Sequence, residues 1–553
     1  MSNRESAHHP PVFGFQDLSG SVDKQIMRTS LAEKTLMWAC APLLYFAFMW
    51  QGSLIVAGRR YFVLIDDAMI SMRYARNLAE GHGLVWNASQ TPIEGYSNLL
   101  WTLVMACAHG LVSDEARVST LVMGAGFGVL LLLGWLFRML LQELKVRDRG
   151  TLIACLALLV FYYPLVYWTL RGMETGLVVL WVYLALWAAL RFESTAQNRH
   201  ALLLGVCVAA AYLTRMDAVL PTGLLAAYAL SSLELRGGLR DLRIAQKNLL
   251  ALLFLALPLL LCLTAHLAFR IQMYGDWLPN TYYLKVVGVD LGERVALGVT
   301  TLASTFQWHL GAPLIAWLLL AGMARSIRRS ELLLVALFAL QCVYSVWAGG
   351  DYAEGQVHGA NRFICVGVPA LLMALALRVE SLRAQRQALG RTPLQMPAVL
   401  AGGVGLLLLL NVSGYVEHFG RGDVLLRADF WRARVGLAIR DLTHADAVIA
   451  SHSAGQIPYF AHRTTIDLLG KNDAEVARGA PAAAFRPGHN KWNYALSIGA
   501  RRPDLIADRW GVLEEYLAKH AQEYVKLNLP GISRPVYLRQ DSEKIRWSKH
   551  ARL

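Results

Sequence analysis

Charged side chains are scarce in this sequence. Only 17% of its 553 residues are Asp, Glu, Lys or Arg, whereas 56% are hydrophobic. The mean hydropathy is correspondingly high, at +0.39. A water-soluble protein of this length does not need so much apolar surface, but a protein embedded in a bilayer does. The composition therefore argues against a soluble enzyme and predicts a membrane protein.

Recognition patterns for metals, disulfides and nucleic acids are also missing. No two of the seven cysteines have metal-ligand spacing, and all lie in or near apolar stretches, which favours buried free thiols (Cys40, Cys107, Cys155, Cys207, Cys262, Cys342 and Cys365). No nucleic-acid recognition motif accompanies the net charge of +14. The surplus of Lys and Arg is better explained by basic cytoplasmic loops and by contacts with anionic phosphates.

Eleven apolar segments are candidate transmembrane spans. About thirty polar residues precede the first of them, so we expect that span to act as an uncleaved anchor. Two short crossings meet at the motif LTRMD (213–217), which predicts a tight turn or a broken helix there. The candidate spans are residues 36–57, 118–141, 151–170, 176–190, 201–213, 220–233, 248–269, 311–323, 331–347, 363–377 and 396–410.

The distribution of basic residues decides the expected topology. The further apolar segment 99–112 is predicted to be an interfacial helix or hairpin on the outer face, because a crossing there would place nearly all basic loops outside. The N-terminus is then inside and the C-terminus outside. We expect a polytopic α-helical protein with a cytoplasmic N-terminal segment (1–35), a transmembrane domain of about eleven helices (36–414) with a large first external loop (58–117), and a periplasmic α/β or α+β domain (415–553).

Nearly all unusual polar motifs fall on the expected outer face. The first external loop carries Asp66 and Asp67 in DDAMISMRYARNLAEGHGLVWN (66–87), followed by EGYSNLLW (94–101). Together with the later motifs, these resemble bacterial GT-C membrane glycosyltransferases, in particular the branch of the mycobacterial terminal arabinofuranosyltransferase and the pseudomonad pilin arabinosyltransferase. The later motifs are RGMET (171–175), LTRMD (213–217), YGDWLPNTYYLK (274–285), GGDYAEGQVHGANRF (349–363), IDLLGKND (466–473), GHNKW (488–492) and RPDLI (502–506).

This resemblance implies a GT-C fold in the inner membrane and transfer of a sugar from a polyprenyl-phosphate donor. It implies D-arabinofuranose as the sugar, and pilin or a cell-envelope glycan as the periplasmic acceptor. Two positions depart from the family pattern: Met216 stands where Pro is expected, and Lys471 replaces a common apolar residue. Both positions bear on local geometry and not on the reaction class.

Asp66 and Asp67 are the predicted catalytic residues. Glycosyl transfer needs a base that takes the proton of the acceptor hydroxyl. Adjacent residues point about 100° apart on a helix, so one aspartate is expected to react and the other to position, to cap the helix predicted over 68–80, or to bind a metal. The resemblance modestly favours Asp66 as the base. If the transfer retains configuration, the same carboxylate acts instead as a nucleophile.

Six basic residues are predicted to bind the donor phosphate: Arg73, Arg76, Arg215, Arg270, Lys285 and Arg362. Arg73 and Arg76 lie on one side of the predicted helix, and a guanidinium suits phosphate oxygens. Three alternatives remain open, namely contact with lipid headgroups, an ion pair of Arg76 with Glu80, and a buried pair of Arg215 with Asp217.

The predicted sugar and acceptor contacts lie in the same external segments. Aromatic residues there can be no more than an interfacial belt, and His82 is more often structural. The tail adds a polar set, Asp467, Asn472, Asp473, His489 and Lys491, which is expected to bind acceptor, to dock against the loops, or to be solvated. The candidate contacts are His82, Glu94, Tyr96, Glu174, Asp276, Trp277, Asn280, Tyr282, Tyr283 and Asp351.

No cofactor is certain from the sequence. Asp351 and Glu354 are candidates for holding acceptor or a divalent cation, Mg²⁺ or Mn²⁺, but no spacing is specific to either ion. Three alternative functions remain. One is a mannosyl- or aminoarabinosyl-type transferase acting on protein or lipid A. The others are a flippase or transporter of polyprenyl-linked sugar, and a non-catalytic scaffold whose tail binds glycans.

Overall fold

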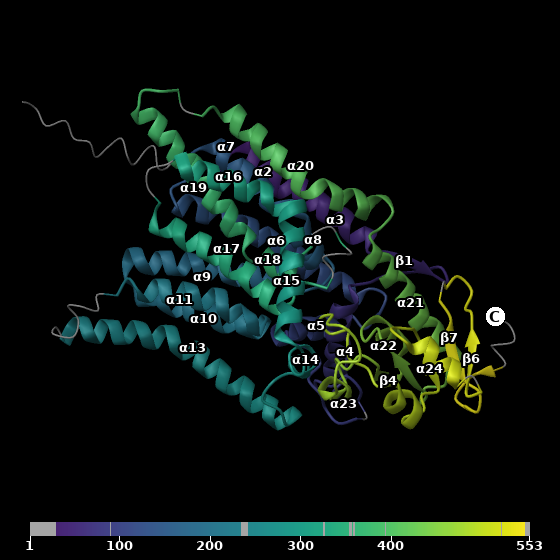
Figure 1. Cartoon of the computed structure of the whole chain (residues 1–553). Coiled ribbons are helices and arrows are strands. Elements are labelled where there is room, and N and C mark those ends of the chain that lie inside the picture. The colour runs from purple at the N-terminus through teal and green to yellow at the C-terminus, as the bar shows by residue number, and fades with distance from the viewer. Residues whose placement is uncertain are drawn as a thin grey trace, which may run out of the picture.

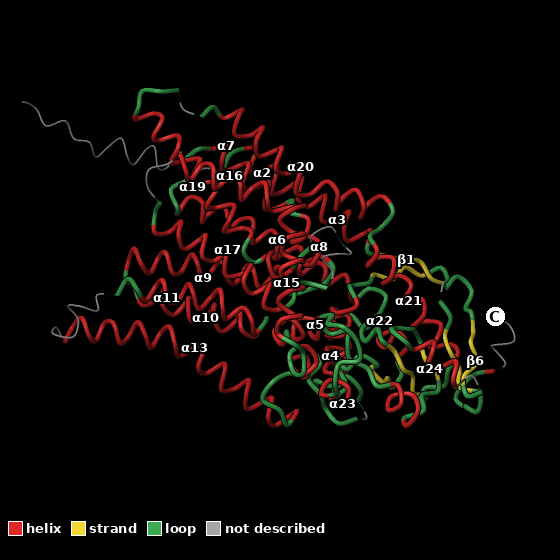
Figure 2. Tube along the Cα trace, viewed as in Figure 1, coloured by secondary structure: helices red, strands yellow, loops and turns green. Residues whose placement is uncertain are grey.

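The protein combines a helical bundle with a C-terminal domain that contains a β-sheet (Figure 1). Both lie in one computed structural model, which describes residues 29–88, 90–233, 242–323, 327–352, 357, 360–392, 394–520, 522–532 and 534–547. In Figure 2 the larger group of strands gathers at one end of the molecule, and long helices fill the rest.

The bundle begins with a helix that contains a π-helical turn and continues into a β-hairpin. Each of the eleven predicted spans overlaps at least one helix. The elements of this part are α2 (Leu31–Thr35), η1 (Leu36–Cys40), α3 (Ala41–Gln51), β1 (Ser53–Val56), β2 (Arg59–Phe62), α4 (Asp66–Ala79), α5 (Leu99–Leu111), α6 (Val118–Glu143), α7 (Arg149–Val160), α8 (Tyr163–Leu170), α9 (Thr175–Thr195), α10 (Asn198–Thr214), η2 (Met216–Ala218), α11 (Val219–Leu230), α13 (Leu242–Tyr274), α14 (Asn280–Lys285), α15 (Leu291–Thr305), η3 (Phe306–Leu310), α16 (Gly311–Met323), α17 (Arg329–Ala348), α18 (Arg362–Cys365), α19 (Val368–Ala388) and α20 (Met396–Gly420).

Five helical segments of the described chain are long and apolar enough to cross a membrane. They are Val118–Glu143, Thr175–Thr195, Gln246–Tyr274, Arg329–Ala348 and Met396–Leu442, and the pair α7 and α8, bent by 42°, adds a sixth if it forms one span. The other predicted spans are also helical but shorter or interrupted. The predicted break within 201–233 lies at Arg215, whose backbone is extended between α10 and η2.

Three predicted boundaries differ from the structure. The first predicted span, 36–57, is helical only to Gln51, after which β1 and β2 form an antiparallel hairpin. The predicted span 151–170 bends where Pro164 enters the first turn of α8, because proline cannot continue the hydrogen-bond pattern of α7. The C-terminal domain begins at α21 (Val424–Leu442), since residue 415 falls inside α20.

The segment 99–112 forms the single short helix α5, which packs against α4, α6 and α10. Its 13 residues rise only about 20 Å, less than the roughly 30 Å hydrocarbon core of a bilayer. This length agrees with the predicted interfacial helix.

The C-terminal domain is a three-layer α/β unit. Its mixed sheet has the strand order β4-β3-β5-β7-β6, with β3 parallel to β4 and β5, and β7 antiparallel to β5 and β6. Alternate strand residues face opposite cores, so Ile449 packs with α21 while Ala450 packs with η4 and α24. The elements are β3 (Val448–Ser451), α22 (Gln456–Ala461), β4 (Thr464–Asp467), α23 (Ala474–Arg478), η4 (Ala495–Ala500), β5 (Leu505–Ile506), α24 (Leu513–Lys519), β6 (Tyr524–Leu527) and β7 (Val536–Arg539).

The first loop and the C-terminal domain pack together at one end of the bundle, where α4 packs against α22 and α14 packs against α23 (Figure 1). Arg73 donates hydrogen bonds to the carbonyls of Trp86 and Arg463, and Arg76 donates to the carbonyl of Tyr459. These buried bonds fix α4 against the domain, because an unpaired buried guanidinium would be costly.

This packing predicts that α5 and the C-terminal domain lie on the same side of the membrane. A phosphatase reporter that is active only outside the cytoplasm should be active when it is fused after Val112 or after Trp547. Fusion after Arg391, in a loop expected inside, should give an inactive reporter. If the reporter were active at one of the first two positions and inactive at the other, the packing would be contradicted. If it were inactive at both, the expected topology would be contradicted.

Candidate active site

Asp66 and Asp67 form the first turn of α4, at the junction of the bundle and the C-terminal domain. The N-cap position belongs to Ile65, and no side chain caps this helix end. The alternative that one aspartate is the helix cap is therefore wrong. The helix also starts two residues earlier than predicted, which places both carboxylates beside the free N–H groups of its N-terminus, where negative charge is stabilised.

Asp66 faces the C-terminal domain. Its Oδ1 accepts a hydrogen bond of 2.8 Å from the backbone N–H of Gln456, and the charge of Arg432 lies nearby. Burial raises the pKa of Asp66 above its ordinary value, although Arg432 and Lys471 oppose the rise. One backbone N–H thus holds the side chain in place. Its carboxylate has a higher affinity for a proton than the carboxylate of a solvated aspartate has.

Asp67 is held by two cations. Its carboxylate lies 2.7 Å from Nζ of Lys471 and 3.5 Å from a terminal guanidinium nitrogen of Arg362. Burial opposes ionisation, but these two charges and the Lys471 hydrogen bond outweigh it, so the pKa of Asp67 lies well below its usual range. Asp67 therefore stays ionised and is a much weaker base than Asp66.

Lys285 completes a basic cluster around the two carboxylates, consisting of Lys285, Arg362, Arg432 and Lys471. Burial and the neighbouring charge of Arg362 lower the pKa of Lys285 to about 8. Among the described residues, none accepts a hydrogen bond from its Nζ. This amine is consequently available to an incoming anion.

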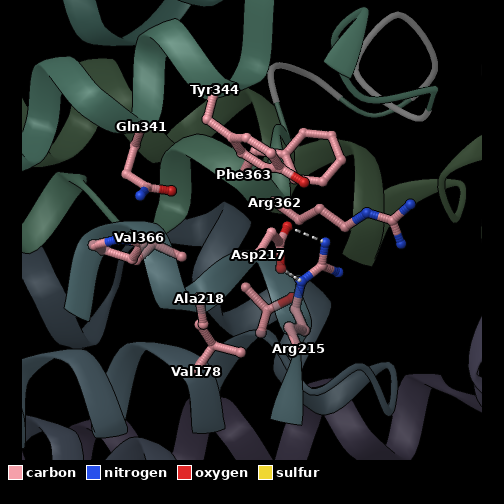
Figure 3. A pocket seen from close by; sticks show the side chains of 11 residues that line it. Val178, Arg215, Asp217, Ala218, Gln341, Tyr344, Arg362, Phe363 and Val366 are labelled. Atoms are coloured by element: carbon pink, nitrogen blue, oxygen red, sulfur yellow. Dashed lines mark hydrogen bonds and ion pairs between the residues drawn. The ribbon is translucent and has the colours of Figure 1, made fainter. Parts of the chain in front are cut away.

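Arg362 also lines a small cavity inside the bundle, which Figure 3 shows from close by. There Arg215 pairs with Asp217 at 2.7 Å and with Glu174 at 2.8 Å, which supports the alternative of a buried structural pair. The cavity measures about 20 Å³, room for one water molecule, so it is too small for a sugar.

Arg73 and Arg76 do not join the basic cluster. Arg73 also donates to Asn87, and Arg76 lies over the ring of Tyr459 at 4.7 Å, so both guanidinium groups are used in domain packing. This is a correction to their predicted phosphate-binding role, because both side chains are engaged by partners outside the basic cluster. Helical spacing predicts that Arg73 and Arg76 lie on one side of α4, but it does not predict which residues contact that side.

Arg270 is likewise engaged elsewhere. It forms a buried, bidentate ion pair with Glu94, and Tyr96 bonds to Tyr274 nearby. These contacts engage Arg270 away from the basic cluster, against its predicted phosphate role, and join the first loop to the end of α13. Asn280 donates to the carbonyls of Gly470 and Lys471 and so fixes the loop that carries Lys471.

The other predicted contacts are spread over this face. Glu174 accepts hydrogen bonds from Asn98 and Arg215 and is buried in the bundle. Asp351 pairs with Arg362, and Asp276 pairs with Arg478. Tyr283 donates to Asp276, while His82, Trp277 and Tyr282 are exposed. Glu354 lies outside the described residues.

The polar set in the tail partly holds the domain together and partly docks it. Asp467 accepts backbone N–H bonds from the loop that follows it, and Asp473 caps α23. Lys491 donates to the carbonyls of Tyr283 and Val287 in the segment after α13, and to that of Ala477. Asn472 bonds to Tyr74 of α4, and His489 stacks on Tyr352 with ring centroids 4.1 Å apart. Docking against the loops predicted to be external is therefore observed for Asn472, His489 and Lys491.

Sequence reasoning missed Arg432 and saw Lys471 only as a departure from a pattern. Arg432 donates to Asp429, which also pairs with the buried Arg171. Nothing in the sequence of α21 distinguishes Arg432 from other arginines of an amphipathic helix. Within the described residues, no group of three His, Cys, Asp or Glu side chains is arranged to hold a metal ion.

The C-terminal domain approaches Asp66 so closely at Gly455 that a side chain at this position would clash. A Cβ at this position would lie 1.8 Å from the backbone oxygen of Asp66. We expect Gly455→Ala to lower stability by about 1–3 kcal/mol, as overpacking does, and to lower the melting temperature of the purified protein. Gly110→Ala in α5, with open space around its Cβ, is the matched control and should not lower it. Equal melting temperatures for both variants would contradict this packing.

Comparison with known proteins extends these observations. Residues 424–546 match the family described as Domain of unknown function (DUF8728). No curated protein matches the sequence. The structure is similar to that of ArnT from Cupriavidus metallidurans bound to undecaprenyl phosphate, at a TM-score of 0.54 and 12% identity over 94% of this chain and 99% of that one. The apo structure of ArnT gives a TM-score of 0.53 at 12% identity, over 91% and 97% of the two chains. The chain thus has the GT-C fold, followed by a C-terminal domain that contains a sheet.

Proposed function

We propose that this protein is a membrane glycosyltransferase that moves a sugar from a polyprenyl-phosphate donor to an acceptor on the outer face of the membrane. The observation that carries the proposal is the pair Asp66 and Asp67, set among Lys285, Arg362, Arg432 and Lys471. The fold shared with ArnT, whose structure holds undecaprenyl phosphate, supports a polyprenyl-linked donor.

The basic cluster provides the means to bind and stabilise a departing phosphate. Lys285, Arg362 and Lys471 come from three different segments and meet beside Asp67. Cations that are already oriented around a leaving group lower the barrier without reorganisation during the reaction. Asp67 offsets part of their mutual repulsion while the donor is absent, and so keeps them in place.

Asp66 is the better placed base of the two. Its pKa is raised by burial, whereas that of Asp67 is depressed by Lys471 and Arg362. In the proposed step the acceptor oxygen bonds to the anomeric carbon as the bond to the phosphate oxygen breaks. The acceptor proton moves to Asp66, and polyprenyl phosphate leaves with the bonding electrons.

We further propose D-arabinofuranose as the sugar, and pilin or a cell-envelope glycan as the acceptor. The support is the resemblance of the external motifs, which extends from Asp66 to the segment 502–506. The proposed site of action is the periplasmic side of the inner membrane, where no soluble nucleotide donor exists. A divalent cation is not needed for any step written above.

Separate neutralisation of the two carboxylates tests the catalytic assignment. We expect Asp66→Asn to lower kcat for transfer from a synthetic polyprenyl-phosphate arabinofuranose by at least about 100-fold, because the general base is lost. Asp67→Asn should mainly raise KM for the donor, since Lys471 and Arg362 lose their shared anchor.

Asp114→Asn, a change in the same loop at a residue paired with the exposed Arg59, is the matched control and should keep the wild-type rate. Wild-type rates in both site variants would refute the assignment. Transport of the donor across liposomes without a glycosylated product would favour a flippase instead.

The pH dependence of donor binding tests the role of Lys285. Its amine carries a proton below its pKa of about 8 and loses it above. KM for the donor should therefore rise as the pH passes through about 8 in the wild type. Lys285→Arg keeps its charge at these pH values, so its KM should stay level between about pH 7 and 9.5. The same rise in that variant would exclude Lys285 as the titrating group.

A further inference from the structure

A second concave site lies on the same face as the basic cluster. It is a groove of about 580 Å³ between the first loop, the segment that follows α13, and the C-terminal domain. Its lining includes Glu94, Asp276, Asn280 and Asp473. Sites for small molecules typically measure about 300–1,000 Å³, so the groove has room for several sugar units.

Four carboxylates of this groove, those of Glu94, Asp276, Asp473 and Glu475, are paired with arginines. The fifth, Asp467, accepts hydrogen bonds from N–H groups of the loop that follows it. Asp276 lies 2.7 Å from Arg478, and Glu475 lies 2.8 Å from Arg501, which also pairs with Asp473. A cationic ligand would have to displace these arginines, and an anionic ligand would meet an excess of carboxylates. Carboxylates and guanidinium groups that form ion pairs can still accept and donate further hydrogen bonds, and the hydroxyls of a neutral ligand can use them.

Asn280 holds the wall of the groove in place. Its side-chain amide donates to the carbonyls of Gly470 and Lys471 at 2.8 and 2.9 Å, so the orientation of the amide is set. Only 5% of the residue is exposed, and Oδ1 accepts no hydrogen bond from the part of the chain that the structure describes. The amide therefore braces the loop from Gly470 to Lys471, and its Oδ1 is buried behind the wall and not presented to a ligand.

The groove is adjacent to the carboxylate pair. Lys471 reaches Asp67 at 2.7 Å, while its neighbour Asn472 lines the groove and bonds to Tyr74 of α4. The loop between β4 and α23 therefore forms a wall shared by both sites. Adjacent residues of one loop therefore contact Asp67 and line the groove.

We propose that this groove binds a neutral oligosaccharide, the part of the acceptor that extends away from the reacting hydroxyl. The role as acceptor rests on the proposed transferase function, whereas the binding itself does not. Anions and cationic peptides are the ligands that the paired charges of the groove disfavour.

Binding to the purified full-length protein, without donor, tests the proposal. The probes are fluorescently labelled arabinose and mannose hexasaccharides, a hexagalacturonate and a hexalysine peptide. Thr91 lines the groove and is exposed, so Thr91→Trp fills it without disturbing the core. We expect this change to weaken binding of at least one neutral hexasaccharide by about tenfold or more. Glu515→Trp, on the exposed surface of α24, is the matched control and should bind as the wild type does.

Binding of neither neutral probe, equal binding by Thr91→Trp and wild type, or tighter binding of hexagalacturonate or hexalysine would each overturn the proposal. If neither protein transfers sugar but the neutral probe still binds in the groove, the transferase function fails while the glycan site stands.

Discussion

The ion pair between Asp67 and Lys471 joins residues 404 positions apart and closes the C-terminal domain onto the bundle. Charges placed at such a junction lose part of their hydration, and that loss must be offset by partners of good geometry. Asp67 has Lys471 and Arg362, while Asp66 has a backbone N–H and the field of Arg432. The site is thus a product of docking and belongs to neither part of the chain alone.

Other buried polar contacts serve this same docking. Arg73 and Arg76 of α4 bind carbonyls of the C-terminal domain, and Arg171 reaches across to Asp429 of α21. Removing one member of such a set leaves the other without a partner in a dry environment, which costs more than the contact itself contributes. Many arginines of this face are therefore structural.

The sequence predicted the parts of the structure that depend on local chain properties. Apolar runs located the helices, and the break at Arg215 followed from a charged residue between two short spans. The position of Asp66 and Asp67 at the start of a helix was also close to correct. The partners of the arginines could not be predicted, because Arg270 meets Glu94 across 176 residues and Arg73 meets Arg463 across 390. Periodicity fixes the side of a helix on which a residue lies, but not the surface that will cover it.

The position of Lys471 near the end of the chain has a consequence for biogenesis. A ribosome completes the helical bundle, including both aspartates, well before the loop between β4 and α23 emerges. Until that loop docks, Asp67 has no lysine beside it, and the wall that contains Asn472 does not exist. A polypeptide that lacks this loop would accordingly lack the ion pair at Asp67, so the site is assembled only after the loop has been translated and has docked.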